Sequence, residues 1–140
     1  MVVAAPGHAM AAGAFVLLAA DVRIGADGPY KVGLNEVAIG LTMPWAGLAL
    51  AEHRLAQPNL QRAVLEATLY TPREAVEVGF LDAVITPDDL DAACASAVER
   101  LGGLNADAFA GTKARRNRAV LEAVRTGAEQ TSAEIRAAAS

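Results

Sequence analysis

Glu36 is the residue of this sequence best suited to transfer protons. It is the only ionisable side chain within residues 32–51, which are otherwise apolar, small or uncharged. Apolar surroundings disfavour the charged form of a carboxylate, and this suits the group to general acid–base work at neutral pH. The residues alone leave a second interpretation open, in which Glu36 lies in a turn and points into water.

A turn of small residues at positions 7–14 could bind negative charge. Gly7 and Gly13 flank a run that is mostly alanine, and an apolar stretch follows at once. At the start of a helix the first backbone N–H groups lack an intrahelical partner, and the helix dipole is positive there. Such a helix start can stabilise a developing oxyanion. Tight packing of small residues is the other explanation of the same pattern.

The elements that must position these two groups alternate between strands and helices. Apolar and β-branched runs predict strands at residues 1–5, 21–24, 30–33 and 81–85. Periodicity and composition predict helices at residues 11–20, 44–56, 60–70, 72–78, 87–101 and 106–139. This alternation indicates an α/β fold whose second half is mostly helical, with a domain boundary near residue 102.

Local signals fix some of these helices more closely. Thr71 and Glu74 have the spacing of a capping box, and Gly79 is expected to end the helix that they open. Residues 11–20 are apolar on every side, which predicts a helix enclosed by other elements. An apolar stripe marks the expected buried face of the helix before residue 102: Leu90, Ala93, Cys94, Ala97, Val98 and Leu101.

Four motifs in a fixed order resemble the crotonase superfamily of enoyl-CoA hydratases and isomerases. They are VVAAPGHAMAAG at residues 2–13, ADVRI at 20–24, VGLNEVAIG at 32–40, and YTPREA with GFLDAV at 70–84. The resemblance covers nearly all of the chain and implies an α/β fold of crotonase type. Residues 1–102 would form the latter part of a spiral of ββα units, and residues 103–140 a C-terminal helical segment for trimerisation.

The resemblance assigns catalytic roles to Ala12 and Glu36. Ala12 stands where the family usually has a glycine whose backbone N–H is one of two oxyanion-hole donors, and alanine keeps that N–H. Glu36 matches the second of the family's two carboxylates. Phe15 stands where hydratases carry the first carboxylate, so the sequence departs from the hydratase pattern at this position.

This departure favours one reaction of the family over another. Adding water to a double bond requires one group that activates water and one that manages the proton. Shifting a double bond requires a single base, which takes a proton from C2 and returns one at C4. The resemblance therefore implies an isomerase acting on 3-enoyl-CoA, with Phe15 keeping water from Glu36. A hydratase or other crotonase reaction is one alternative, and a non-catalytic CoA-binding subunit or fragment is another.

Other side chains are weaker candidates for substrate contacts. His8 lies beside the expected oxyanion site, and Trp45 could line an acyl pocket. Lys113 matches a lysine with which the family commonly approaches CoA phosphates, and a solvated helix face is the alternative for it. His53 has no second ligand at metal spacing, and Cys94 is expected to be an inert thiol. The predicted chemistry needs no metal, and coenzyme A enters only as part of the substrate.

Composition limits which partners and which cellular compartment we expect for this protein. With 12 Lys and Arg against 16 Asp and Glu, the net charge of −4 gives no general affinity for nucleic acid or anionic membranes. A single cysteine allows no intramolecular disulfide and fits a reducing compartment. The uncharged stretch at residues 2–20 lacks the positive start of a signal peptide, and its apolar run is too short to span a bilayer. We expect a cytoplasmic protein.

The expected core is thin. Small side chains make up much of the apolar share, since 33 of the 140 residues are alanine. Subunit contacts are the natural way to bury more surface, and the resemblance implies a homotrimer or hexamer. The family's N-terminal half, which supplies the second oxyanion donor, has no counterpart in this sequence. A complementary N-terminal chain is therefore a further expected partner.

Overall fold

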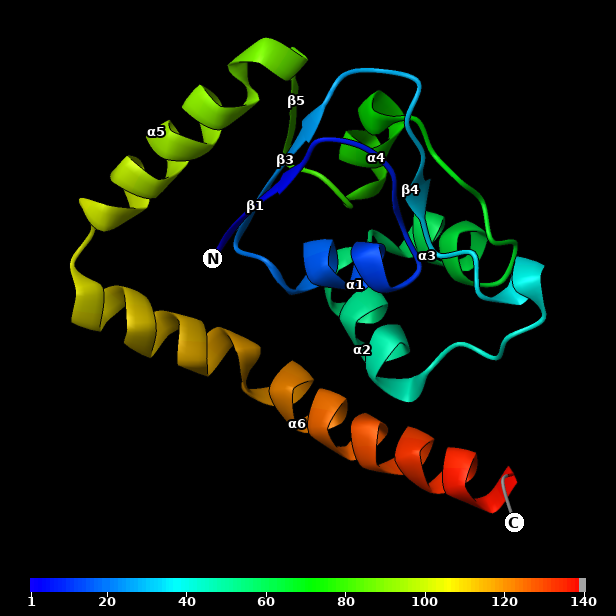
Figure 1. Ribbon diagram of the computed structural model, residues 1–140. Coiled ribbons are helices and arrows are strands. Elements are labelled where there is room, and N and C mark those ends of the chain that lie inside the picture. The colour runs from blue at the N-terminus through cyan, green and yellow to red at the C-terminus, as the bar shows by residue number, and fades with distance from the viewer. Residues whose placement is uncertain (139–140) are drawn as a thin grey trace.

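Three parallel strands form the centre of the fold. The structure, a computed structural model, describes residues 1–138 (Figure 1). Strand β1 (Val2–Ala5) pairs with β3 (Val22–Ala26), and β3 pairs with β5 (Ala83–Ile85), which gives the strand order β1-β3-β5. These strands are mostly apolar, as parallel strands covered on both faces require.

A second, two-stranded sheet lies where the chain leaves β1. Strand β2 (Ala9–Met10) runs parallel to β4 (Val32–Gly33), and the Ala11 N–H donates to the Gly33 carbonyl at 3.1 Å. The sequence analysis misses β2, because two residues are too few to show an alternating pattern. This small sheet joins the two segments that carry the predicted catalytic residues.

Helices account for most of the remaining chain. Helix α1 (Ala12–Ala19) returns the chain from the carboxyl end of β1 to the amino end of β3. The other helices, including the short 3₁₀ helices η1 and η2, follow in chain order: η1 (Val37–Ile39), α2 (Trp45–Arg54), α3 (Gln57–Val64), α4 (Pro72–Val78), η2 (Pro87–Asp89), α5 (Leu90–Gly102) and α6 (Ala106–Ala138).

The core consists of two groups of buried side chains, one on each face of the parallel sheet. The larger group joins α1, α2 and α4, and in it Leu17, Leu18 and Phe80 are at most 1% exposed. The smaller group joins β3 to α5 through Ile24 and Leu90. Burying one such side chain contributes about 1.5–3 kcal/mol to folding. Figure 1 shows α5 on one side of the strands and α1 and α2 on the other.

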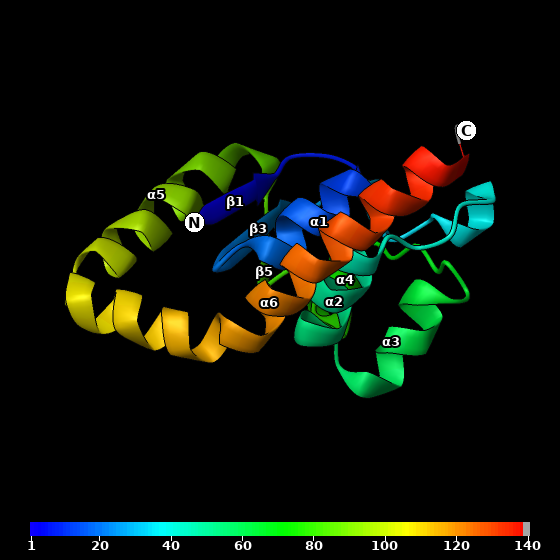
Figure 2. The same ribbon diagram turned by 90° about the horizontal axis from the view of Figure 1, so that it is seen from below.

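Helix α6 lies across α2 and passes close to its first turn (Figure 2). This approach depends on Gly127, where a Cβ atom would lie 2.7 Å from the Ala46 nitrogen and 2.8 Å from the Trp45 carbonyl carbon. The Trp45 indole N–H also donates to the Glu134 carboxylate at 2.9 Å. The helix continues through Gly111 and Gly127 without a break.

The structure corrects the prediction of a helix at residues 60–70. Helix α3 begins at Gln57 and ends at Val64, and Ala67 has a φ of 50°, which no α-helix accommodates. Tyr70 forms an antiparallel bridge with Val32, in which each backbone N–H donates to the other residue's carbonyl at 2.9 Å. This pairing satisfies the backbone groups of Tyr70 outside a helix.

Two expectations about buried helix faces are also wrong in part. Helix α1 is not enclosed on every side, because Val16 is 52% exposed while Leu17 and Leu18 are buried. On α5, Leu90 and Ala97 face the sheet as predicted, but Val98 is 57% exposed. Apolar periodicity gives the centre of a buried face, and its width depends on how many neighbours pack there.

The helix-boundary signals are confirmed at α4. The Thr71 N–H donates to the Glu74 carboxylate at 2.7 Å, and the Glu74 N–H donates to the Thr71 hydroxyl at 3.4 Å, which completes a capping box. Gly79 ends the helix with a φ of 105°, in the left-handed region that favours glycine. Capping chemistry is local, so it can be recognised from sequence alone.

The proposed division into residues 1–102 and 103–140 stays a prediction. Its boundary falls in the turn between α5 and α6, and α6 packs on α2 of the preceding part.

Within residues 1–138, no helix is both long enough and apolar enough to cross a bilayer.

Candidate active site

Glu36 is buried, with 4% of its surface exposed, just before the 3₁₀ helix η1. Its backbone carbonyl accepts from the N–H groups of Ile39 at 3.1 Å and Leu41 at 2.9 Å, which fixes the turn around it. Its Oε2 atom is buried and has no hydrogen-bond partner among the described residues. A buried carboxylate oxygen without a partner is costly in a folded protein, so its retention suggests a functional reason. The burial excludes the interpretation that Glu36 points into water.

The start of α1 presents a backbone donor held by unusual geometry. Ala11 has φ 50° and ψ −118°, a conformation that costs a residue with a Cβ about 1–3 kcal/mol. The Ala14 and Phe15 N–H groups donate to the Ala11 carbonyl at 2.9 and 3.1 Å. The Ala12 N–H has no backbone acceptor in the part of the chain that the structure describes. Ala12 is also exposed, so this donor is open to a ligand.

The small sheet links this donor to the segment of Glu36. The hydrogen bond from Ala11 to Gly33 ties the residue before Ala12 to the residue three positions before Glu36. Gly33 is required there, because a Cβ atom would lie 2.9 Å from the Thr68 carbonyl oxygen. The fold therefore holds together the segments of Ala12 and Glu36, which lie 24 residues apart in sequence.

An apolar cavity of about 500 Å³ opens directly after Glu36. Its wall comes from the turn at residues 37–43, from α2, from the end of α3 and from one side chain of α6. Trp45 closes one side, where its indole N–H meets Glu134. The apolar lining residues are Val37, Leu41, Met43, Leu48, Val64 and Leu65. A cavity of this size and lining can hold a hydrocarbon group, and its wall begins at Val37, the residue after the buried Glu36.

The remaining predicted site residues lie in different places. Phe15 is half-buried and packs on α2, where a Cβ atom at Gly47 would lie 2.5 Å from its ring. His8 accepts from the Lys31 N–H through Nδ1 at 3.0 Å. Lys113 pairs with Asp21 beside the amino end of β3, whereas Ala12 follows the carboxyl end of β1. The structure thus does not bring Lys113 together with Glu36 and Ala12.

Sequence reasoning missed the partners that shape the site. Glu134 lies 89 residues from Trp45, and no local sequence pattern predicts that contact. The strained backbone at Ala11 also has no signature, because alanine carries no preference for positive φ. The apolar residues Val37, Ile39 and Leu41 around Gly40 were an available signal, since an apolar turn commonly covers a ligand or another chain.

Other reactive side chains give no separate site. Burial, and then the charge of Asp91, raises the pKa of the half-buried Cys94 thiol, which disfavours the reactive thiolate. Within residues 1–138, no three His, Cys, Asp or Glu side chains gather as a metal site would require.

Comparison with known proteins identifies the family. The family model described as enoyl-CoA hydratase/isomerase matches residues 1–139. Human mitochondrial enoyl-CoA delta isomerase 1 is 33% identical over 99 residues, which is 70% of this chain and 33% of that protein. A probable enoyl-CoA hydratase of Mycobacterium tuberculosis is 33% identical over 103 residues, which is 73% of this chain and 39% of that protein.

A solved structure gives the same result for the fold. An enoyl-CoA hydratase/isomerase family protein from Pseudomonas syringae superposes with a TM-score of 0.87 at 42% identity, over 89% of this chain and 54% of that one. The chain belongs to the enoyl-CoA hydratase/isomerase family and has the crotonase fold, which confirms the α/β prediction. It spans about half the length of that structure and matches between a third and two-fifths of the length of the two curated relatives.

Proposed function

We propose that this protein isomerises 3-enoyl-CoA thioesters to 2-enoyl-CoA, with Glu36 as the general acid and base. The observation that carries the proposal is the buried Oε2 atom of Glu36, which lacks a partner among the described residues and belongs to the residue next to Val37 in the wall of an apolar cavity. The similarity to human enoyl-CoA delta isomerase 1 supports the same reaction.

In the proposed reaction Glu36 takes a proton from C2 of the substrate. The electrons of that C–H bond form a C1=C2 double bond as the C=O pair of the thioester moves onto its oxygen, which gives a dienolate. When the carbonyl re-forms, the C1=C2 pair becomes the C2=C3 double bond, and the C3=C4 pair takes the proton that Glu36 returns to C4. The negative charge on the thioester oxygen in between is stabilised by the Ala12 N–H and the positive end of α1. A second donor from a segment absent from this chain would complete the oxyanion hole.

The other predicted residues would bind the substrate. Trp45 and the apolar cavity would hold the acyl chain, and Phe15 would exclude water from the reacting carbons. His8 keeps its Nε2 atom available for a polar contact, and Lys113 would need to exchange Asp21 for a CoA phosphate. Proton transfer by one carboxylate needs no metal and no cofactor beyond the coenzyme A of the substrate.

Product identification tests this proposal. The native protein, purified with any chain that accompanies it, is incubated separately with a 3-enoyl-CoA and a 2-enoyl-CoA, and the products are separated by chromatography. We expect the 2-enoyl isomer from the first substrate and little 3-hydroxyacyl-CoA from either. Efficient hydration of the 2-enoyl substrate would refute the isomerase assignment.

Hydration is the second candidate, because the Mycobacterium tuberculosis relative at the same 33% identity is named a probable hydratase. Phe15 distinguishes the two, since a benzyl ring cannot accept a proton or orient water. Phe15→Glu should therefore admit water and produce some 3-hydroxyacyl-CoA while isomerisation falls, since two nearby carboxylates disturb each other's titration. Phe15→Leu is the matched control and should produce none. Equal hydration by both variants would contradict the role of Phe15.

We further propose that the protein works in the cytoplasm as a homotrimer or hexamer, with a complementary N-terminal segment. Exposed apolar side chains support the assembly, among them Val16 at 52% and Leu65 at 65% exposure. Sedimentation is the test, and a stable monomer of 14.4 kDa would contradict the proposal. A chain without catalytic activity would appear in the product assay as no turnover of either substrate.

A further inference from the structure

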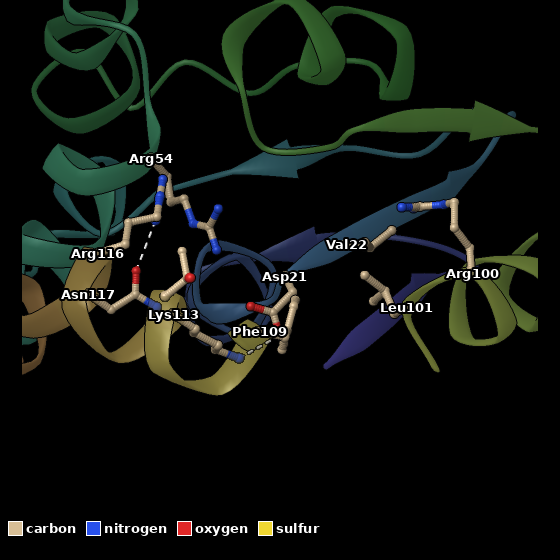
Figure 3. A pocket seen from close by; sticks show the side chains of 10 residues that line it. Asp21, Val22, Arg54, Arg100, Leu101, Phe109, Lys113, Arg116 and Asn117 are labelled. Atoms are coloured by element: carbon tan, nitrogen blue, oxygen red, sulfur yellow. Dashed lines mark hydrogen bonds and ion pairs between the residues drawn. The ribbon is translucent and has the colours of Figure 1, made fainter. Parts of the chain in front are cut away.

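A second cavity lies at the amino end of the parallel sheet. Its volume is about 380 Å³, which is ordinary for a small-molecule site. Asp21 and Val22 border it where β3 begins, and the early turns of α6 form another wall (Figure 3). Because α1 runs from one end of the sheet to the other, this cavity lies at the opposite end from Ala12.

Cations dominate the lining of this cavity. Four cationic side chains and one carboxylate take part, namely Arg54, Arg100, Lys113, Arg116 and Asp21. The Asp21 carboxylate pairs with both the Lys113 ammonium and the Met1 amino group, each at 2.5 Å, so it offsets only one of these two positive charges. None of the three arginines forms an ion pair with a carboxylate of the described residues.

Arg54 and Arg116 hydrogen-bond to neutral groups. The Arg54 Nε–H donates to the Leu18 carbonyl at 2.9 Å, and its Nη2 group donates to the Ala20 carbonyl, which satisfies the end of α1. The Arg116 guanidinium donates to His53 Nε2 at 2.7 Å. These contacts orient both guanidinium groups and leave their charge uncompensated.

The titration of neighbouring groups reflects this excess of positive charge. Burial, followed by the charges of Arg23 and Arg116, lowers the pKa of Arg54. Burial, followed by the charges of Arg116 and Arg54, lowers the pKa of His53. Burial is the larger cause of both shifts, and a bound anion would relieve the smaller contribution, which comes from repulsion among the cations.

Apolar side chains line the middle of the cavity, and Thr112 and Asn117 add two uncharged polar groups to its lining. Figure 3 shows Arg54, Arg116 and Lys113 toward one end and Arg100 toward the other, with Phe109, Val22 and Leu101 between them. Phe109, Lys113 and Arg116 recur on one face of α6 at the spacing of a helix, so one rigid element presents the aromatic ring and the cations together.

We propose that this cavity binds a phosphate monoester of an apolar or aromatic group. Arg54 and Arg116 lie toward one end of the cavity, where their two charges equal the charge of one phosphate dianion, while Arg100 lies toward the other end. Guanidinium groups bind phosphate through paired N–H bonds. The esterified group lies against Phe109 and Leu101. A monocarboxylate would leave one guanidinium charge without a partner, so it binds more weakly.

Calorimetric titration with phenyl phosphate tests the proposal. At pH 8 the probe is a dianion, since the second pKa of phosphate monoesters is about 6. At about 0.15 M salt, which screens distant charges, we expect saturable one-site binding that is tighter than for inorganic phosphate or benzoate. Absence of saturation at millimolar probe, or equal affinity for inorganic phosphate, would overturn the proposal.

Charge variants locate the site. Arg116→Gln should weaken binding about tenfold, because it removes a charge-assisted contact. Arg118→Gln is the matched control, with the same charge change two residues along α6 and outside the cavity lining, and it should change the affinity less than about twofold. Asp21→Asn should tighten binding by several-fold, because it frees Lys113. Equal effects of Arg116→Gln and Arg118→Gln would overturn the location.

Competition identifies the source of the phosphate ester. Coenzyme A carries a 3′-phosphate monoester, which dephospho-coenzyme A lacks. If coenzyme A displaces phenyl phosphate and dephospho-coenzyme A does not, the proposal is supported and the ligand is the 3′-phosphate of the substrate itself. If neither compound displaces it, the proposal is supported and the ligand is a separate organic phosphate. Equal displacement by both compounds would overturn the monoester, since the two differ only in the 3′-phosphate. These outcomes do not depend on isomerase activity.

Discussion

The two ends of the parallel sheet handle charge in opposite ways. At the end where α1 begins, the Glu36 carboxylate is buried, its Oε2 has no partner among the described residues, and the residues after it line an apolar cavity. Where α1 ends, cations outnumber carboxylates four to one around a cavity, and every polar contact of Arg54 goes to a backbone carbonyl. Apolar surroundings favour proton transfer at the first end, whereas accumulated positive charge favours anion binding at the second. The difference suggests that one sheet supports two kinds of site.

Glu36→Gln should remove most of the catalytic activity at the end of the sheet where α1 begins, and it should leave anion binding at the other end unchanged. The amide has nearly the same shape but cannot accept the C2 proton, so turnover should fall by about 10²–10⁴-fold. Product formation from 3-enoyl-CoA measures the loss, and circular dichroism verifies the fold. Phenyl phosphate affinity serves as the control, because the cavity at the other end is unchanged. Unaltered turnover in a folded variant would remove Glu36 from the mechanism.

Ala12→Pro should lower the activity of the same candidate active site by changing its backbone. Proline suits the first position of a helix but lacks the N–H, so it removes one oxyanion donor. The expected loss of turnover is about 10²–10³-fold, the usual effect of deleting one such donor. Ala12→Gly retains the N–H and should keep far more activity than the proline variant. Equal activity of these two variants would show that the Ala12 N–H does not contact the substrate.

A pair of glycine substitutions on α6 compares its two ends in terms of stability. Gly127→Ala places a Cβ atom 2.7 Å from the Ala46 nitrogen, and this overpacking should lower the free energy of unfolding by about 1–3 kcal/mol. Gly111→Ala meets no atom within 4 Å and should raise it by about 0.5–1 kcal/mol, since alanine favours the helix. Urea denaturation measures both, and the same sign for both variants would contradict the close contact with α2.

The cationic end should also give the protein a pH dependence near neutrality. Because the pKa of His53 is lowered in the folded protein from 6.5, the unfolded chain binds the proton more readily just below that pH. Stability should therefore fall as the pH drops below 6.5, by at most about 1.4 kcal/mol per pH unit for one group. Thermal unfolding of His53→Gln beside the parent protein isolates this contribution. An identical pH slope in both proteins would exclude His53 as its source.

The sequence supports the order of elements better than their contacts. The parallel strands, the capping box at Thr71 and the stop at Gly79 follow from local chemistry, and the structure reproduces them. The end of α3 does not follow from local chemistry. Tyr70 pairs with Val32, which lies far back in the chain, instead of extending the helix. Local propensity loses to such tertiary pairing.

In the candidate active site, too, some features can be predicted from the sequence and others cannot. Glu36 stands out in sequence because its neighbours are uncharged, and its burial agrees with that pattern. The pairing of Trp45 with Glu134 and the gathering of cations from α2, α5 and α6 depend on how α6 lies over the rest of the chain. No window of the sequence contains both sides of either contact.

The contact between α2 and α6 has a consequence for the synthesis of the protein. Trp45 and Glu134 lie 89 residues apart, so nearly the whole chain must leave the ribosome before α6 can cover α2. Pairing across such sequence distances slows folding, and partly folded intermediates expose apolar surface that aggregates. The nascent chain therefore passes through a period in which α6 does not yet cover α2.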